Sequence, residues 1–284
     1  MLVLHRLGLV AIVAALAACT VTTQPSSGLP GGEPAGEVEA APPAAPREAG
    51  EETDPEDPTP GPDPGSKPTT PGEILGTLSG SCGIVKTQLT KTTSTLERNL
   101  LAFVAGETYE KASLSSDGQR MYETPNAGGS STESEVMSLE VLRACEGAKL
   151  LKTETQIGYS DATAGPPSIT DILVEIGGKK VGVSVTRAYR PQNLSFPDSD
   201  VKALLEKKLE GVNRSSERLK PEDKWVKQIL HVFAATKAQA DAVVRVLPTI
   251  DAAVRSDTIV LLTQTTGGGF VYCDPDPPLG SECP

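Results

Sequence analysis

The chain of 284 residues carries a formal net charge of −11 and has only two histidines. It has no basic excess, so its composition argues against a protein that binds nucleic acid through a broad positive surface. Once an N-terminal leader and linker are set aside, residues 74–284 are long enough for one domain with its own hydrophobic core.

The N-terminus has the features of a secretory signal. Arg6 precedes an uncharged run over residues 7–18, which is too short to span a bilayer as a helix but suits a signal-peptide core. The run ends in Leu16-Ala17-Ala18-Cys19, which resembles the lipobox of bacterial lipoproteins. The resemblance implies a signal peptide over residues 1–18 and a lipidated Cys19 at the mature N-terminus.

The same resemblance predicts where the protein is located. In lipoproteins, acyl chains such as palmitate hold the protein at the membrane. Thr20, rather than an aspartate, follows the cysteine, and this favours the outer membrane over the inner membrane in Gram-negative cells. We therefore expect a lipid-anchored protein of the cell envelope, with the choice between periplasmic and surface display left open.

Residues 19–73 differ in composition from the rest of the chain. They are rich in proline, glycine and alanine, and they hold eleven acidic and two basic residues. Such a segment buries too little apolar surface to offset its chain entropy, so we expect a disordered tether. Residues 74–284 then hold 26 acidic and 23 basic residues, a mild balance that does not favour a nucleic-acid partner.

Four cysteines remain after Cys19, and an even number in an exported chain indicates two disulfides. Three pairings are possible, and we favour Cys82–Cys145 and Cys273–Cys283. The last two cysteines bracket a proline-rich loop, and the first two each lie at the end of a predicted helix. We do not expect a zinc site, because the chain has no Cys-x-x-Cys and no histidine near these cysteines.

Hydrophobic periodicity and turn residues predict the elements of residues 74–284. In chain order they are a helix over 84–104, a loop over 112–131, a helix over 132–146, strands over 149–159, 171–176 and 179–186, a helix over 198–210, a strand over 225–234, a helix over 237–255, and strands over 258–264 and 270–273. This order is typical of an α/β domain with a central mixed sheet flanked by helices.

The clearest local unit is a β-hairpin around Gly177-Gly178, which suits a tight two-residue turn. In that register Ile176 faces Lys179 and Asp171 faces Ser184. One face of the hairpin is then apolar and consists of Ile172, Val174, Ile176, Val181 and Val183.

This hairpin, within the predicted order of helices and strands, resembles the PD-(D/E)XK (restriction-endonuclease-like) fold over residues 132–265. In that family an aspartate that begins one strand and a (D/E)-x-K on the next hold Mg²⁺ and position the attacking water. Asp171 matches the aspartate, but Ser184 and Thr186 occupy the positions of the second carboxylate and the lysine. Neutral hydroxyls neither attract a divalent cation strongly nor supply a positive charge. We therefore expect no metal or other cofactor, and Mg²⁺ only if substitutes complete the site.

Other residues are candidates for such substitutes or for separate sites. Glu154 or Glu140 could supply a second carboxylate, and Lys180 projects from the same hairpin face as Asp171. Arg187 and Arg190, just after the strand, could clamp an anion, although surface ion pairs are the simpler interpretation.

Two further residues are interpreted as parts of the core. His231 lies within an apolar strand and is expected to be a hydrogen-bonded core histidine. Trp225, at a strand start, is expected to be a core residue rather than a ligand platform.

The sequence therefore favours a membrane-anchored envelope lipoprotein with a non-catalytic binding or scaffolding domain, and a protein of the envelope as its partner. The alternative is a divergent metal-dependent nuclease or other hydrolase on the PD-(D/E)XK-like core, with Asp171, Glu154 and Lys180 as candidate catalytic residues. The two differ in whether a second carboxylate and a basic side chain converge on Asp171.

Overall fold

The structure, a computed structural model, describes residues 76–104, 110–127, 132–160, 168–190 and 196–273. The signal peptide, Cys19, the tether and Cys283 lie outside these ranges, so the expectations about them remain predictions. Within the described residues, no helix has both the length and the apolar character needed to cross a bilayer.

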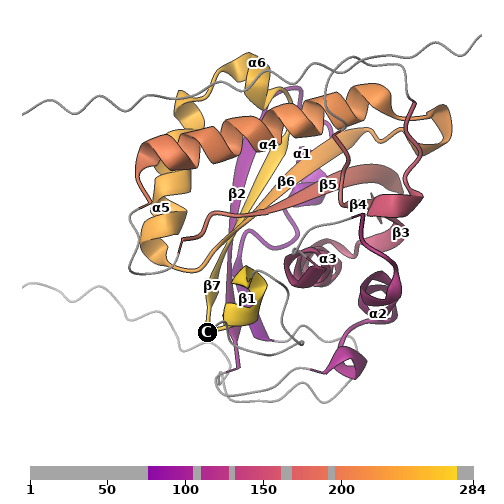
Figure 1. The fold of residues 1–284 in the computed structure, drawn as a ribbon, viewed down its shortest axis with the longest axis horizontal. Coiled ribbons are helices and arrows are strands. Elements are labelled where there is room, and N and C mark those ends of the chain that lie inside the picture. Colours follow the sequence, from indigo (N-terminus) through magenta and orange to yellow (C-terminus); the bar gives the residue numbers. More distant parts are fainter. Residues whose placement is uncertain (1–75, 105–109, 128–131, 161–167, 191–195, 274–284) are drawn as a thin grey trace, which may run out of the picture. The chain divides into compact units, whose positions relative to one another are not determined.

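Seven strands within the described residues form one mixed sheet in the order β1-β2-β7-β6-β5-β4-β3 (Figure 1). The strands are β1 (Gly76–Gly80), β2 (Thr95–Phe103), β3 (Lys149–Thr153), β4 (Ile172–Ile176), β5 (Lys179–Arg187), β6 (Lys227–Ala234) and β7 (Ile259–Thr266). The four strands β2, β7, β6 and β5 are parallel, and antiparallel strands extend the sheet at both edges.

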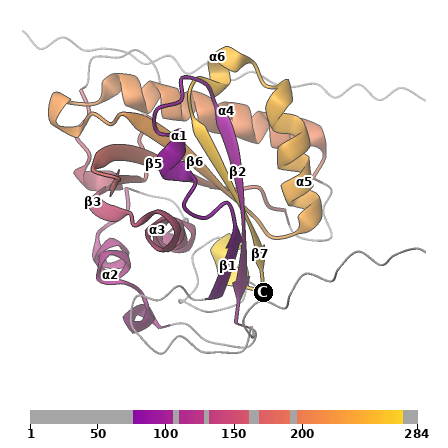
Figure 2. The same ribbon diagram turned by 180° about the vertical axis from the view of Figure 1, so that it is seen from behind.

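Helices cover both faces of this sheet. The α-helices are α1 (Val85–Gln88), α2 (Ser116–Glu123), α3 (Thr132–Glu146), α4 (Asp198–Arg218), α5 (Lys237–Val246) and α6 (Ala252–Arg255). Short 3₁₀ helices are η1 (Lys111–Ser113), η2 (Glu154–Gln156), η3 (Pro221–Asp223), η4 (Leu247–Thr249) and η5 (Gly269–Tyr272). Helices α3 and α2 lie on one face, and α4 and α5 lie on the other, as Figures 1 and 2 show from opposite sides. The predicted fold class, a central mixed sheet flanked by helices, is confirmed.

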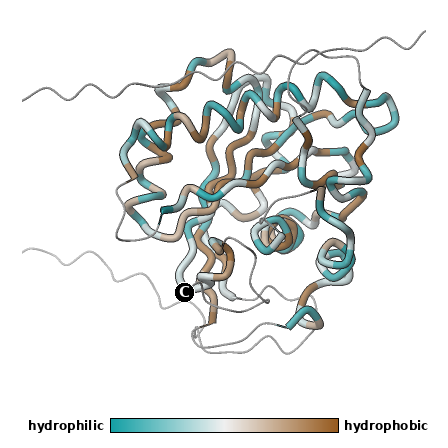
Figure 3. Tube along the Cα trace, in the orientation of Figure 1, coloured by the Kyte–Doolittle hydropathy of each residue, from teal (hydrophilic) through white to brown (hydrophobic). Residues whose placement is uncertain are grey.

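The central strands are apolar on both faces because both faces are covered. In β6, Ile229 and Phe233 belong to the core beneath α3, whereas Leu230 and Val232 belong to the core beneath α4. Figure 3 shows hydrophobic residues concentrated along these strands, while hydrophilic residues recur along α4.

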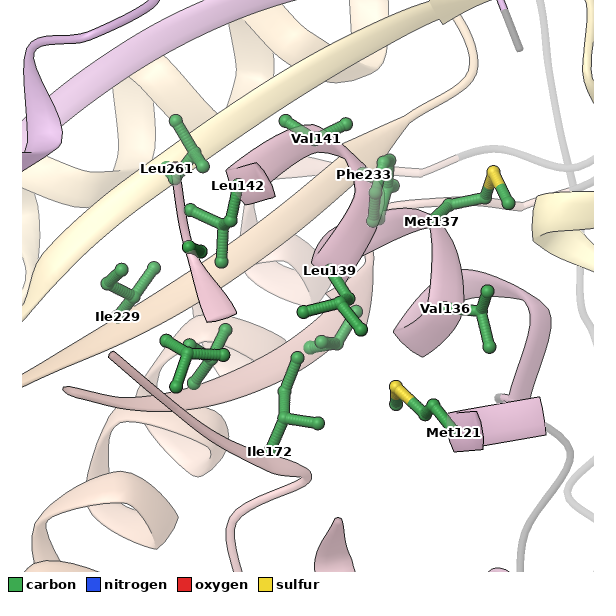
Figure 4. Packing of buried hydrophobic residues seen from close by; sticks show 14 of the residues in the cluster. Met121, Val136, Met137, Leu139, Val141, Leu142, Ile172, Ile229, Phe233 and Leu261 are labelled. Carbon is green, nitrogen blue, oxygen red and sulfur yellow. The ribbon is translucent and has the colours of Figure 1, made fainter. Parts of the chain in front are cut away.

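The core beneath α3 is closely packed, and Figure 4 shows it from nearby. One helix supplies much of it, so that α3 is almost entirely buried. The labelled side chains of this core are Met121, Val136, Met137, Leu139, Val141, Leu142, Ile172, Ile229, Phe233 and Leu261. Burying side chains of this kind contributes roughly 1.5–3 kcal/mol each before the entropy of ordering is subtracted.

The predicted hairpin is confirmed in its register. Ile176 pairs with Lys179 and Ile172 pairs with Val183, so the predicted apolar face lies in the core beneath α3. Gly177 and Gly178 have φ angles of 57° and 72°, the left-handed conformation that a two-residue hairpin turn requires and that glycine adopts without strain.

The predicted helix over 84–104 is wrong. Only the short α1 is helical there, and β2 occupies the second half of the segment. Burial alternates along the strand: Asn99 and Leu101 are buried, whereas Leu100 is 39% exposed. The leucine spacing imitates a helical stripe, but pairing with β1 and β7 satisfies the backbone of this segment on both sides.

Other expectations also differ from the structure. The strand expected over 149–159 is β3 followed by η2, and the helix expected over 198–210 continues to Arg218 as α4. The expected loop over 112–131 contains α2, and the expected helix over 237–255 is divided into α5, η4 and α6, with Pro248 in η4. The expected strand over 270–273 is the 3₁₀ helix η5, which follows left-handed Gly267 and Gly268 and is buried in the core.

The predicted Cys82–Cys145 disulfide is present, with an S–S distance of 2.08 Å. It joins the segment before α1 to the end of α3. Glu146 reinforces the same junction, because its carboxylate accepts hydrogen bonds from the backbone N–H groups of Val85 and Lys86. Cys273 is also disulfide-bonded, but Cys283 lies outside the described residues and the second pairing remains a prediction.

Candidate functional site

Asp171 lies immediately before β4, where the resemblance to the nuclease fold places a metal-binding aspartate. Its carboxylate accepts a hydrogen bond of 2.5 Å from the backbone N–H of Val185 in β5. Burial raises the pKa of Asp171 to about 6, although the positive charge of Lys208 and the Val185 N–H both oppose this shift. The Asp171 side chain therefore links β4 to β5 in an environment that disfavours its charge.

Ser184 and Thr186, which the resemblance places at the positions of the second carboxylate and the lysine, are buried in β5. Ser184 pairs with Leu230 and Thr186 with Val232 of the neighbouring strand. Neither side chain carries a charge at neutral pH. Within the part of the chain that the structure describes, no group of three or more His, Cys, Asp or Glu residues is arranged to hold a metal ion.

A lysine and a glutamate do act on Asp171, but the lysine is not the predicted one. Lys208 of α4 lowers the pKa of Asp171, and its ammonium lies 3.5 Å from the backbone oxygen of Val185. Glu154 raises the pKa of Asp171 through repulsion, and its carboxylate accepts a hydrogen bond of 2.8 Å from the Ala127 N–H. Lys180 instead donates to the backbone oxygen of Glu222.

Asp171 and Glu154 line a very small cavity, which we call the Asp171 pocket. It has a volume of about 10 Å³, enough for about one water molecule. Its walls come from α2, α3, β3 and the loops between them and are formed by Met121, Thr124, Pro125, Asn126, Thr132, Glu135, Thr153, Glu154 and Asp171. Glu140, the other candidate carboxylate, accepts hydrogen bonds from Ser115 and pairs with Arg143.

The two candidate anion-binding arginines do not converge. Arg187 donates to the backbone oxygen of Cys273, and Arg190 pairs with Asp200 at 2.8 Å. Arg190 also lies over the ring of Phe196, with 5.8 Å between the guanidinium carbon and the ring centroid. These partners all belong to the chain itself, which favours the interpretation as intramolecular contacts.

His231 is a buried core residue with both ring nitrogens satisfied, as predicted. It lies 2.8 Å from the hydroxyl of Ser138 in α3 and 2.8 Å from that of Thr263 in β7, and it stacks on Phe233. Burial lowers the pKa of His231 to about 3, so the imidazole is neutral at physiological pH. This histidine connects α3 to the sheet and is not positioned for chemistry with a solute.

A larger cavity lies beside the starts of β6 and β7, and we call it the Trp225 cavity. It has a volume of about 420 Å³, within the range of about 300–1,000 Å³ usual for small-molecule sites. Its walls come from the end of α4, the starts of β6 and β7, and α6, and are formed by Asn213, Ser216, Glu217, Leu219, Lys224, Trp225, Val226, Lys227, Gln228, Ala253, Ser256 and Asp257.

Trp225 occupies its place because β5 has no side chain beneath it. A Cβ atom at Gly182 would lie 2.7 Å from carbon atoms of the indole ring, so only glycine admits this ring onto the sheet. The Trp225 ring also packs near Leu173 and Leu219, and its indole N–H donates to the hydroxyl of Ser216 at 3.0 Å. Trp225 is therefore both a partial core residue, as expected, and a wall of the cavity.

Hydrogen bonds fix the polar side chains around the Trp225 cavity. The amide of Gln228 donates to the Asn213 side chain at 3.0 Å and to the Thr258 hydroxyl at 3.1 Å. Asn213 donates in turn to the backbone oxygen of Val254 at 2.9 Å. These bonds assign the orientation of both amides and join α4 to the region of α6.

The floor and rim of the Trp225 cavity contain two unusual residues. Lys227, in β6, is almost completely buried, and its ammonium lies 2.9 Å from the carboxylate of Asp257. Ser256 has a φ of 49°, the one positive value among the described residues other than glycine. A non-glycine residue in this conformation stores roughly 1–3 kcal/mol, and such strain is commonly found at functional sites.

The Trp225 cavity and the role of Lys208 were missed by sequence reasoning. Gly182 interrupts an alternating strand, which is a signal that another group approaches the backbone. Lys227 is a second signal, because a lysine within a strand that is buried throughout needs a partner for its charge. Lys208 lies beside the apolar stripe of α4, but nothing in the sequence relates it to Asp171.

No protein-family model matches the chain. The AAC-rich mRNA clone AAC4 protein of Dictyostelium discoideum is 41% identical over 166 residues, which is 56% of this chain and 24% of that protein. The chain thus spans about a quarter of that relative's length. A solved structure of Pyrococcus furiosus SfsA in complex with Ca²⁺ covers 48% of this chain and 58% of its own, with 14% identity and a TM-score of 0.27.

Proposed function

We propose that this chain is a lipid-anchored envelope protein whose folded domain binds a ligand or partner without catalysing a reaction. The observation that carries the binding function is the Trp225 cavity, which combines an aromatic ring with oriented amides, hydroxyls and charged groups. Sites of this kind hold ligands through a few fixed polar groups on an apolar surface. The lipid anchor rests on the lipobox resemblance at Cys19.

The anchor is tested by changing Cys19 alone. Cys19→Ala should move the protein from the membrane fraction to the soluble fraction and abolish labelling by a fatty-acid analogue, because no thiol remains to be acylated. Thr20→Ala is the matched control, since it changes a neighbouring residue and keeps the thiol. Equal membrane retention and labelling in the Cys19 variant would contradict the anchor.

The binding function is tested by photo-crosslinking in cells. Val226 lines the Trp225 cavity and is 57% exposed, so a photoreactive side chain there points toward a bound molecule without disturbing the core. The full chain with this side chain should form a defined adduct. The same side chain at Lys237, which is highly exposed on α5, is the matched control. Equal adducts at both positions, or none at Val226, would contradict binding at the cavity.

A second candidate function is a divergent metal-dependent hydrolase. Two specific observations favour it. Lys208 lowers the pKa of Asp171 and Glu154 raises it, so both charges lie close enough to affect this carboxylate. Burial raises the pKa of Asp171 to about 6. Titratable groups with shifted pKa values are often found at catalytic sites. Mg²⁺ would need Asp171 and Glu154 as ligands, and Lys208 would supply the positive charge missing at Thr186. Cleavage of nucleic acid distinguishes this function from the first one.

A further inference from the structure

We propose that the Trp225 cavity binds a neutral saccharide, with the sugar ring stacked on the indole of Trp225. This inference rests on the proposed binding function and specifies the chemical class of the ligand. Three properties of the cavity lead to it: the kind of aromatic surface, the mixture of donors and acceptors, and the balance of charge.

The aromatic surface is an indole whose polar atom is already used. The N–H of Trp225 donates to Ser216, and Gly182 supports the ring from the sheet. Because the N–H is engaged, the part of the ring that lines the cavity contributes carbon atoms, whose π electrons carry partial negative charge. A sugar ring presents a flat row of C–H groups of partial positive charge, and this surface packs well on such a ring.

The polar walls suit hydroxyl groups, which both donate and accept. Asn213 and Gln228 each present an amide with donor and acceptor atoms, and their mutual hydrogen bond fixes which way each amide points. Ser216 and Ser256 add hydroxyls at the same wall and rim. These amides bond to each other and to neighbouring groups of the chain, and each amide oxygen has a second lone pair to which a sugar hydroxyl can donate.

The charges around the cavity balance. Two acids, Glu217 and Asp257, face two lysines, Lys224 and Lys227, and one of these lysines already pairs with Asp257. An anionic ligand would meet two carboxylates and a cationic ligand two ammonium groups, so neither gains a net attraction. A ligand without formal charge avoids both penalties. This argument separates a saccharide from a nucleotide or an amine, which also stack on aromatic rings.

The strained backbone at Ser256 supports a binding role for the same cavity. A positive φ at this serine holds the rim between α6 and β7 in one shape. Fixing a wall before the ligand arrives lowers the entropy lost on binding. Serine rather than glycine at this position keeps a hydroxyl at the rim.

The intrinsic fluorescence of the full chain tests this inference, because Trp225 is the only tryptophan. The probes are chitotriose, maltotriose and cellotriose as neutral saccharides, with ATP and spermidine as charged aromatic and cationic alternatives. We expect at least one neutral saccharide to change the emission saturably at roughly millimolar concentration or below, and the charged probes to have no such effect.

Variants of residues in and outside the cavity locate the binding site, and calorimetry measures their affinity for the saccharide. Trp225→Ala and Asn213→Ala should each weaken saccharide binding by roughly tenfold or more, Trp225→Phe should weaken it less, and Lys237→Ala should leave it unchanged. If Trp225→Ala does not fold, the Asn213 variant and Trp225→Phe decide. Binding that is unaffected by these changes, stronger binding of a charged probe, or no saccharide binding would overturn the inference.

The crosslinking experiment at Val226 keeps the two proposals separable. A specific adduct at Val226 without saccharide binding would overturn the saccharide inference and leave the binding function intact. The absence of both would overturn both.

Discussion

The Asp171 pocket and the Trp225 cavity differ in how their polar groups are used. The carboxylate of Asp171 accepts a hydrogen bond from the Val185 N–H, and the Asp171 pocket has room for about one water molecule. The Trp225 cavity has a volume of about 420 Å³ and is lined by oriented amides, hydroxyls and charged side chains. A family resemblance directs attention to the first region, whereas the physical features of a binding site occur in the second.

This difference shows that a motif position and a functional site need not coincide. In a nuclease-like core, the aspartate, the second carboxylate and the lysine act together on a metal. By the resemblance, Ser184 and Thr186 occupy the positions of two of the three, and Asp171 connects β4 to β5 through the Val185 N–H. Buried polar groups such as Asp171 then connect elements of the fold, and a ligand binds where polar groups remain accessible.

The largest expected effect concerns whether both regions belong to one cooperative unit. Replacing both Cys82 and Cys145 with serine should lower the free energy of unfolding by roughly 2–5 kcal/mol, because the disulfide closes a long loop. The measurement is urea denaturation followed by Trp225 fluorescence, near the cavity, and by far-ultraviolet circular dichroism, for the whole fold. Transitions at different urea concentrations for the two signals would contradict the expectation that both regions unfold as one cooperative unit.

An intermediate effect is expected at Asp171. Its folded-state pKa of about 6 exceeds the usual 3.8, so its contribution to stability is fully present below the usual value and is lost as pH rises through about 6. Asp171→Asn keeps an acceptor for the Val185 N–H but cannot ionise. The variant should therefore be more stable than the wild type by roughly 1–3 kcal/mol at about pH 7.5 and nearly equal at about pH 4.

When the wild type and the Asp171→Asn variant are compared at the same pH, the contributions of other titrating groups to stability cancel. His231 has a lowered pKa of about 3, so its own contribution is lost as pH falls below 6.5, in both proteins alike. Denaturation across this pH range gives the difference directly. A variant that is less stable than the wild type at neutral pH would show that the ionised carboxylate stabilises the fold.

The smallest expected effect concerns the rim of the Trp225 cavity. Ser256→Gly should stabilise the fold by about 1 kcal/mol, because glycine adopts a positive φ without strain. Ser256→Ala is the matched control, since it removes the hydroxyl and keeps the Cβ atom, and it should give no such gain. Thermal denaturation measures both. A glycine variant that is no more stable than the alanine variant would mean that the rim stores no strain.

Local patterns predicted the elements that lie close together in the chain. The hairpin register follows from Gly177-Gly178 and strict alternation, and the α3-to-β7 order follows from periodicity and turn residues. The segment that became β2 could not be predicted in this way, because its backbone partners, β1 and β7, come from both ends of the domain. The leucine spacing of this segment fits both a helix and a strand, and only pairing with distant strands decides between them.

The candidate sites were predicted only in part. Asp171 follows from a motif position, but Lys208 reaches it from a helix more than thirty residues later, and no spacing rule relates the two. The Trp225 cavity combines residues from α4, β6, α6 and β7. Sites assembled from several elements depend on tertiary packing, and Gly182 and the buried Lys227 are the local signs of the cavity in the sequence.

The central claim is that Asp171 serves the fold and that recognition takes place at the Trp225 cavity. Its most direct test is a cleavage assay of the full chain with Mg²⁺ or Mn²⁺ against single- and double-stranded DNA and against RNA. We predict no cleavage above that of Asp171→Asn, because the Asp171 pocket has room for about one water molecule and, among the described residues, no group of three or more His, Cys, Asp or Glu residues is arranged to hold a metal ion. Metal-dependent cleavage that disappears in Asp171→Asn, while circular dichroism shows the variant folded, would contradict the claim and establish the hydrolase.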